Sequence, residues 1–100
     1  MTEPIDLGLG HILRFTKWAP DRALNPQYDG VPDIDPVGAT IEHGNGCGGS
    51  LLFDLPGVRT LFPNRPVWNV ESMNPLTISP SVLCMCGDHG YVRDGKWVPS

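Results

Sequence analysis

The chain has 100 residues, of which 40% are apolar, twelve are glycine and eleven are proline, and its formal net charge is −4. This composition excludes long uninterrupted helices, because glycine is entropically costly in a helix and proline removes a backbone donor. We therefore predict a single, mainly β domain over residues 1–100, with a small antiparallel sheet and long loops rich in proline and glycine. A core this small leaves a narrow stability margin, so a bound metal ion that joins distant segments would stabilise the fold.

The charge and the apolar pattern also narrow the environment and the partners. A net negative charge disfavours broad binding to the phosphates of nucleic acids. No apolar run approaches the roughly 20 residues that span a bilayer, and residues 1–4 lack the pattern of a signal peptide. We expect an intracellular or virion-borne protein without membrane contact. Three cysteines are an odd number in such a chain, which favours thiols available to a metal over a disulfide framework.

In the first half of the chain, alternating side chains over residues 11–18 predict a strand with His11 on the same face as Leu13 and Phe15. Residues 19–38 hold four prolines among acidic turn residues, which predicts a long surface loop. A short strand is expected over residues 39–42. The glycine-rich turn at 44–49 follows, and it leads into a strand over 50–54.

In the second half, residues 55–66 form a connection punctuated by prolines, and strands are expected over 67–71 and 76–79. Pro80 suits the first position of a single helical turn that would run into Val82 and Leu83. Finally, an Asp-Gly pair lies between two strand-like triplets. This pattern predicts a β-hairpin over residues 91–98.

Two clusters of possible metal ligands occupy turns between these strands. The first turn carries His43 and Cys47, and the second carries Cys84, Cys86 and His89. Zinc takes four nitrogen and sulfur ligands in a tetrahedron, which two such turns can supply. We predict structural Zn²⁺ bound by Cys47, Cys86 and His89, with His43 or Cys84 as the fourth ligand. His43 gives two ligands from each turn. Cys84 lies so near Cys86 in the sequence that joint ligation would be strained, and its alternative role is a small buried hydrophobe.

A catalytic metal site would instead need an open coordination position beside an acid or base. Asp88 and Glu42 adjoin the proposed ligands, but we expect Asp88 to cap backbone donors in its turn and Glu42 to lie on a solvated strand face. Cys86 with His89 as nucleophile and base is less favoured, since a catalytic cysteine usually finds its histidine far off in sequence. His11 is expected to lie away from both clusters.

The segment ISPSVLCMCGDHGYVRDGKW at 78–97 resembles a family of small bacterial and phage proteins of unknown function. Those proteins end in a proline-serine stretch, a C-x-x-H pair, an aromatic-aliphatic strand and a glycine turn. With DLGLGH at 6–11 and WAPDR at 18–22, the whole chain resembles small proteins of actinobacteriophages and their hosts. The resemblance implies a zinc-ribbon-like domain in the host cytoplasm or the virion, with Cys47, Cys86 and His89 at metal-type positions. The family tends to have two or more cysteines in the first loop, and the single one here leaves room for His43.

Taken together, these patterns favour a small zinc-binding module that is structural and not catalytic. Its proline-rich segments at 20–36 and 56–66 would face a protein partner. The first alternative is a zinc-dependent hydrolase with an open metal site, using Asp88 or Glu42 as base. The second is a nucleic-acid-binding zinc ribbon, which the negative charge makes the weaker reading.

Overall fold

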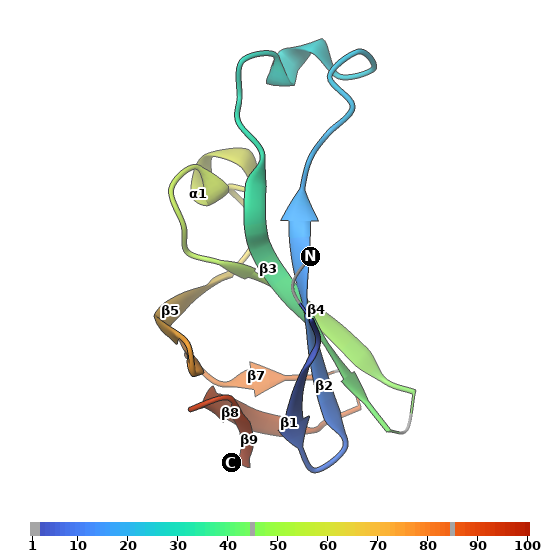
Figure 1. The fold of residues 1–100 in the computed structure, drawn as a ribbon, viewed down its shortest axis with the longest axis vertical. Coiled ribbons are helices and arrows are strands. Elements are labelled where there is room, and N and C mark those ends of the chain that lie inside the picture. Colours follow the sequence, from blue (N-terminus) through green and yellow to red (C-terminus); the bar gives the residue numbers. More distant parts are fainter. Residues whose placement is uncertain (1–2, 45, 85) are drawn as a thin grey trace.

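The computed structural model describes residues 3–44, 46–84 and 86–100. The described residues fold mainly into strands, which confirms the predicted mainly β class (Figure 1). Within them, no helix has the length and apolar character needed to cross a bilayer. The elements in chain order are β1 (Ile5–Gly8), β2 (His11–Trp18), the 3-10 turn η1 (Pro26–Tyr28), β3 (Ile34–His43), β4 (Gly48–Phe53), α1 (Val58–Leu61), β5 (Val67–Met73), β6 (Leu76–Ser79), β7 (Val82–Leu83), β8 (His89–Arg93) and β9 (Lys96–Pro99).

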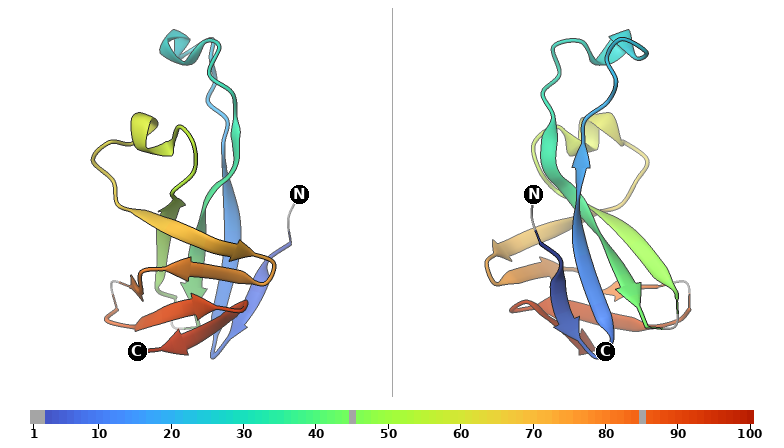
Figure 2. Two further views of the ribbon diagram at one scale, coloured as in Figure 1. Left: turned by 90° about the vertical axis from the view of Figure 1, so that its left-hand side faces the viewer. Right: turned by 45° about the vertical axis from the view of Figure 1, so that its right-hand side comes forward.

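The strands form two sheets that close on one another. Strands β1 to β6 make a six-stranded sheet in chain order, and β7 to β9 make a three-stranded antiparallel sheet. The large sheet curls, so that β5 and β6 run across the direction of β2 and β3 (Figure 2). Strand β8 packs beside β6 and β9 packs beside β1. The small sheet therefore bridges the two edge strands of the large one, which protects edges that would otherwise be open to pairing.

One step of the large sheet departs from the predicted antiparallel arrangement. Strands β4 and β5 pair in parallel, with Leu52 opposite Val67 and Phe53 opposite Trp68. A parallel pair needs a crossover of a dozen or so residues, and the proline-punctuated connection between these strands, which carries α1, supplies that length. The other neighbouring strands pair antiparallel, as predicted.

Strand boundaries follow burial more closely than local sequence. Strand β2 has the predicted bounds, whereas β3 begins at Ile34 instead of residue 39. The earlier start arises because Ile34 and Val37 pack with Val58 of α1 in a second, smaller hydrophobic cluster. The predicted helical turn after Pro80 is wrong, since Val82 pairs with Gly90 in an extended ladder. Strand pairing there satisfies backbone groups that one helical turn would leave without partners.

The main core lies between the two sheets. Its buried side chains come from strands of both sheets, so the core exists only where the two sheets pack together. These side chains include Leu13, Phe53, Ile78, Val92 and Trp97.

Truncating the centre of this core should be costly. The Phe53 side chain is 0% exposed and lies edge-on to Phe15, with ring centroids 6.2 Å apart. We expect Phe53→Ala to lower the free energy of unfolding by about 3–5 kcal/mol, through lost burial and the cavity left behind. Urea unfolding measures this change. Leu24→Ala is the control, because Leu24 is 79% exposed, and a similar loss from both variants would contradict the assigned core.

Candidate metal centre

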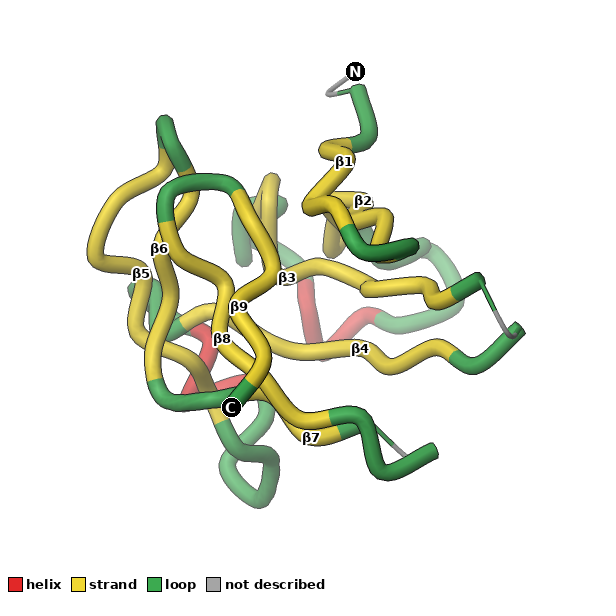
Figure 3. The backbone as a smooth tube through the Cα atoms, turned by 90° about the horizontal axis from the view of Figure 1, so that it is seen from below, coloured by secondary structure: helices red, strands yellow, loops and turns green. Residues whose placement is uncertain are grey.

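Three turns lie toward the lower end of the molecule in the view of Figure 1, and on the same side of it in Figure 3. They are the turns between β1 and β2, between β3 and β4, and between β7 and β8. His11 and His43 are register partners on β2 and β3, which places their side chains on the same face. Asp88 precedes β8 and reaches both rings. The antiparallel register of β2 and β3 therefore brings together two histidines that are 32 positions apart in the chain.

The two turns that carry the predicted ligands share one backbone pattern. The N–H of His43 donates to the carbonyl of Cys47 at 2.8 Å, and the N–H of Gly46 donates to the carbonyl of His43 at 3.1 Å. In the other turn Cys84 N–H donates to the carbonyl of Asp88, and Gly87 N–H to the carbonyl of Cys84, each at 2.9 Å. Gly46 and Gly87 have φ of +83° and +90°, a conformation that side chains rarely adopt. These glycines let both turns close tightly over short spans.

Asp88 lies between the two imidazoles. Its Oδ2 is 2.7 Å from Nε2 of His11 and 2.9 Å from Nδ1 of His43. The hydrogen bond from His11 keeps the pKa of the Asp88 carboxyl below its ordinary value, and the charges of His11 and His43 act in the same direction. An ionised carboxylate only accepts hydrogen bonds, so Nδ1 of His43 carries the proton. In the neutral imidazole of His43 the lone pair is then on Nε2.

That second nitrogen of His43 faces sulfur. Cys84 Sγ lies 2.8 Å from Nε2 of His43, and Cys84 is only 4% exposed. Burial raises the pKa of the Cys84 thiol above its ordinary value, and charge at Cys86, Cys47 and Asp88 raises it further. Cys86 and Cys47 are therefore near enough to Cys84 for their charges to affect its thiol.

An aromatic side chain, Trp97, packs against the two histidines. The rings of His11 and Trp97 stack with centroids 4.3 Å apart and an interplanar angle of 13°. His11 and His43 meet edge to face at the same centroid distance. Both histidines are at most 9% exposed. The rings are therefore held from the core side by packing and from the solvent side by Asp88.

The structure brings together some of the residues predicted from the sequence. His43 and Cys84, the two alternatives for a fourth ligand, contact each other. The charges of Cys47 and Cys86 raise the pKa of the Cys84 thiol. His89 contacts two serines instead, with its Nε2 2.7 Å from the hydroxyl of Ser81 and its Nδ1 2.9 Å from the hydroxyl of Ser100.

Two roles predicted for neighbouring residues are wrong, and a third is confirmed. His11 is not remote, because strand pairing sets it beside His43. The Asp88 carboxylate binds the two imidazoles instead of capping backbone donors, and its carbonyl closes the turn. Glu42 is solvated as expected, 3.7 Å from Arg14. Because His11 shares a strand face with Leu13, the sequence predicts that it points inward. The register that brings it to His43 depends on the long loop between β2 and β3, which the sequence pattern does not determine.

His11, His43 and Asp88 form a group that could hold a metal ion, since their ligand atoms all lie within 4.8 Å of one another. Two imidazoles and a carboxylate suit zinc and several other divalent transition metals.

The order Cys84, His43, Asp88 also matches that of a thiol nucleophile with its base and orienting acid. A catalytic cysteine needs an accessible thiolate with a depressed pKa, however. Cys84 is buried and its pKa is shifted upward, so the arrangement disfavours nucleophilic attack by this thiol.

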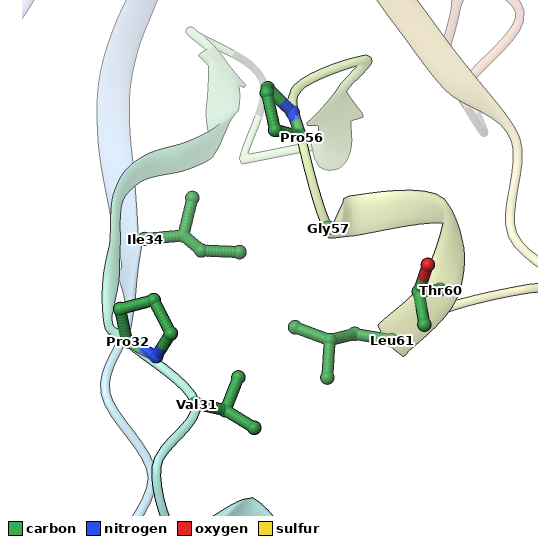
Figure 4. A pocket seen from close by; sticks show the side chains of 7 residues that line it. All are labelled: Val31, Pro32, Ile34, Pro56, Gly57, Thr60 and Leu61. Atoms are coloured by element: carbon green, nitrogen blue, oxygen red, sulfur yellow. The ribbon is translucent and has the colours of Figure 1, made fainter.

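An apolar pocket lies at the other end of the molecule. It has a volume of about 230 Å³ and opens between the start of β3 and α1 (Figure 4). Of the side chains that line it, only Thr60 is polar. The lining therefore has no side chain suited to act as an acid, a base or a metal ligand. Its lining residues are Val31, Pro32, Ile34, Pro56, Gly57, Thr60 and Leu61.

Comparison of the chain with protein-family models, with curated proteins and with solved structures finds no match.

Proposed function

We propose that the chain is a structural zinc-binding domain in which His43, Cys47, Cys84 and Cys86 hold one ion. The observation that carries this proposal is the 2.8 Å approach of Cys84 Sγ to Nε2 of His43, the ring nitrogen that Asp88 does not contact. The electrostatic effect of Cys47 and Cys86 on Cys84 supports them as the other two ligands. Three thiolates and one imidazole are a common tetrahedral set for structural zinc.

The ion is assigned to the sulfur side of His43 and not to the side of His11 and Asp88. The contacts of Asp88 with the two histidines, at 2.7 and 2.9 Å, are those of charge-assisted hydrogen bonds. The Cys84 thiol faces the other ring nitrogen of His43, and thiolates are the ligands that structural zinc sites most often use. Asp88 then acts as the outer partner that fixes the tautomer and orientation of a zinc-bound imidazole.

Such an ion would join the two sheets. His43 and Cys47 flank the turn that connects β3 and β4 in the large sheet, whereas Cys84 and Cys86 lie in the turn that connects β7 and β8 in the small one. Structural zinc contributes about 10–16 kcal/mol of apparent folding free energy in small domains. Four protein ligands leave no open coordination position, so this centre supports a scaffold for a protein partner and not a hydrolase.

Cobalt substitution tests the ligand set. We expect one Co²⁺ per chain, an intense thiolate-to-metal charge-transfer band in the near ultraviolet, and the visible spectrum of tetrahedral Co²⁺. Cys84→Ser should weaken this band, because one of three thiolates is lost, whereas His89→Ala should leave it intact, because both ring nitrogens of His89 face serine hydroxyls. A Co²⁺ complex without the charge-transfer band would place the ion on His11, His43 and Asp88. Loss of the band in His89→Ala would restore His89 as a ligand.

Replacing the outer partner should weaken the metal centre without abolishing it. Asp88→Asn keeps the shape of the side chain but removes the charge that accepts from Nδ1 of His43. We expect zinc affinity, measured by competition with a chromophoric chelator, to fall about 10–100-fold. Asp94→Asn is the matched control, because Asp94 lies in the β8–β9 turn at φ +51°, which Asn tolerates. Unchanged affinity in Asp88→Asn would contradict the orienting role.

A further inference from the structure

The outer face of the small sheet carries features that the metal centre does not explain. Side chains alternate across β7 to β9, so that Val82, Val92 and Trp97 point into the core and their neighbours point outward. Leu83 is 69% exposed and Val98 is 36% exposed. In the view of Figure 3, β8 and β9 lie in front of β3 and β4. This outward face consists of Leu83, His89, Tyr91, Arg93, Lys96 and Val98.

The face combines cations with an aromatic ring. The guanidinium carbon of Arg93 lies 4.3 Å from the centroid of the Tyr91 ring, and the His89 ring lies 6.4 Å from it on the same strand. Tyr91 is the register partner of Val98, and Arg93 is the register partner of Lys96. Like charges directly opposite each other on a sheet are destabilising. An anionic group bound over Arg93 and Lys96 would relieve that repulsion.

The charge of this face differs from that of the rest of the chain. The net charge is −4, yet residues 89–99 contain Arg93, Lys96 and His89 against a single carboxylate, Asp94. Asp94 lies in the turn, where its backbone N–H donates to the hydroxyl of Thr77. An acidic ligand is therefore attracted to this face and repelled by most other surfaces, which gives orientation as well as affinity.

We propose that the outer face of β7 to β9 docks an acidic protein segment that also carries aromatic or aliphatic side chains. The cations would meet its carboxylates, and the exposed Leu83 and Val98 and the half-buried Tyr91 would meet its apolar groups. Single-stranded nucleic acid fits less well, because its binding scales with the number of phosphates neutralised, and this face offers only two permanent cations. The proposal rests on Arg93, Lys96, Leu83, Tyr91 and Val98, none of which is a candidate metal ligand, so it does not depend on which ligands hold the metal.

Nuclear magnetic resonance titration of the full chain in zinc-containing buffer tests the proposal. The probes are a random copolymer of glutamate and tyrosine, poly-glutamate, and an oligothymidylate. We expect the copolymer to shift amide resonances of β7 to β9, to bind more tightly than poly-glutamate, and to weaken with salt. Absence of shifts in these strands, or binding of the oligothymidylate in preference to the copolymer, would overturn the proposal.

Charge reversal supplies a matched pair of variants. Arg93→Glu should weaken copolymer binding about tenfold or more, the size of effect that 1.4 kcal/mol of lost interaction produces. Lys17→Glu makes the same change in net charge on an exposed position of β2 and should leave binding nearly unchanged. An equal loss of copolymer affinity in both variants would show that only net charge matters and would contradict the proposal. Retained cobalt spectra in both variants separate this result from any failure of the metal centre.

Discussion

Removal of zinc is expected to unfold the chain. The ion would hold the turn at residues 43–47 against the turn at 84–88, and these turns belong to different sheets. If zinc supplies about 10–16 kcal/mol of apparent stability, a 100-residue domain with an ordinary margin of roughly 5–15 kcal/mol loses most of it on chelation. We expect the thermal unfolding transition to fall sharply or vanish in excess chelator at neutral pH, and to return when zinc is added back.

Ligand substitutions show whether this loss comes from the proposed centre. Cys84→Ser should lower zinc affinity by more than the roughly 10–100-fold caused by loss of an outer partner, and its melt should resemble that of the chelated protein. His89→Ala should keep both the metal and the melt. An unchanged melt after chelation, with no zinc found by elemental analysis, would refute a structural metal in this chain.

Gly38→Ala is expected to be among the most damaging single substitutions. Gly38 lies on β3, paired with Thr16 of β2 and Leu52 of β4. An added Cβ would collide with the carbonyl oxygen of Leu51 and lie 3.0 Å from Cα of Leu52. Both obstacles are backbone atoms, so β3 and β4 would have to separate. We expect a loss above about 4 kcal/mol, measured by urea unfolding, or failure to fold.

The control for this substitution is Gly44→Ala. An added Cβ at Gly44 meets nothing within 4 Å, and Gly44 is exposed. The stability of Gly44→Ala should stay within about 0.5 kcal/mol of the parent chain, as is usual for surface changes. Comparable stabilities in the two variants would contradict the pairing of β3 with β4.

The sequence predicts much of the fold where the signal is local. The Asp-Gly pair at 94–95 marks the β8–β9 hairpin, and alternation over 11–18 gives β2 its bounds. The parallel pairing of β4 with β5 depends on how a crossover packs, and no short pattern encodes that. Val82 shows the same limit, since its strand forms only because β8 lies beside it.

The residues of the candidate site also differ in how far the sequence predicts them. Cysteine and histidine spacing marks both turns, because metal ligands must be of particular residue types. His11 and Asp88 carry no such mark. They reach His43 only through the register of β2 with β3 and through the turn that precedes β8. Spacing alone also favoured His89 over Cys84, whereas the fold directs His89 to Ser81 and Ser100 and brings Cys84 to His43.

X-ray absorption at the zinc edge of the zinc-loaded chain tests the central claim most directly. The account predicts three sulfur neighbours at about 2.3 Å and one nitrogen neighbour at about 2.0 Å. A shell made only of nitrogen and oxygen would contradict it and would move the ion to His11, His43 and Asp88.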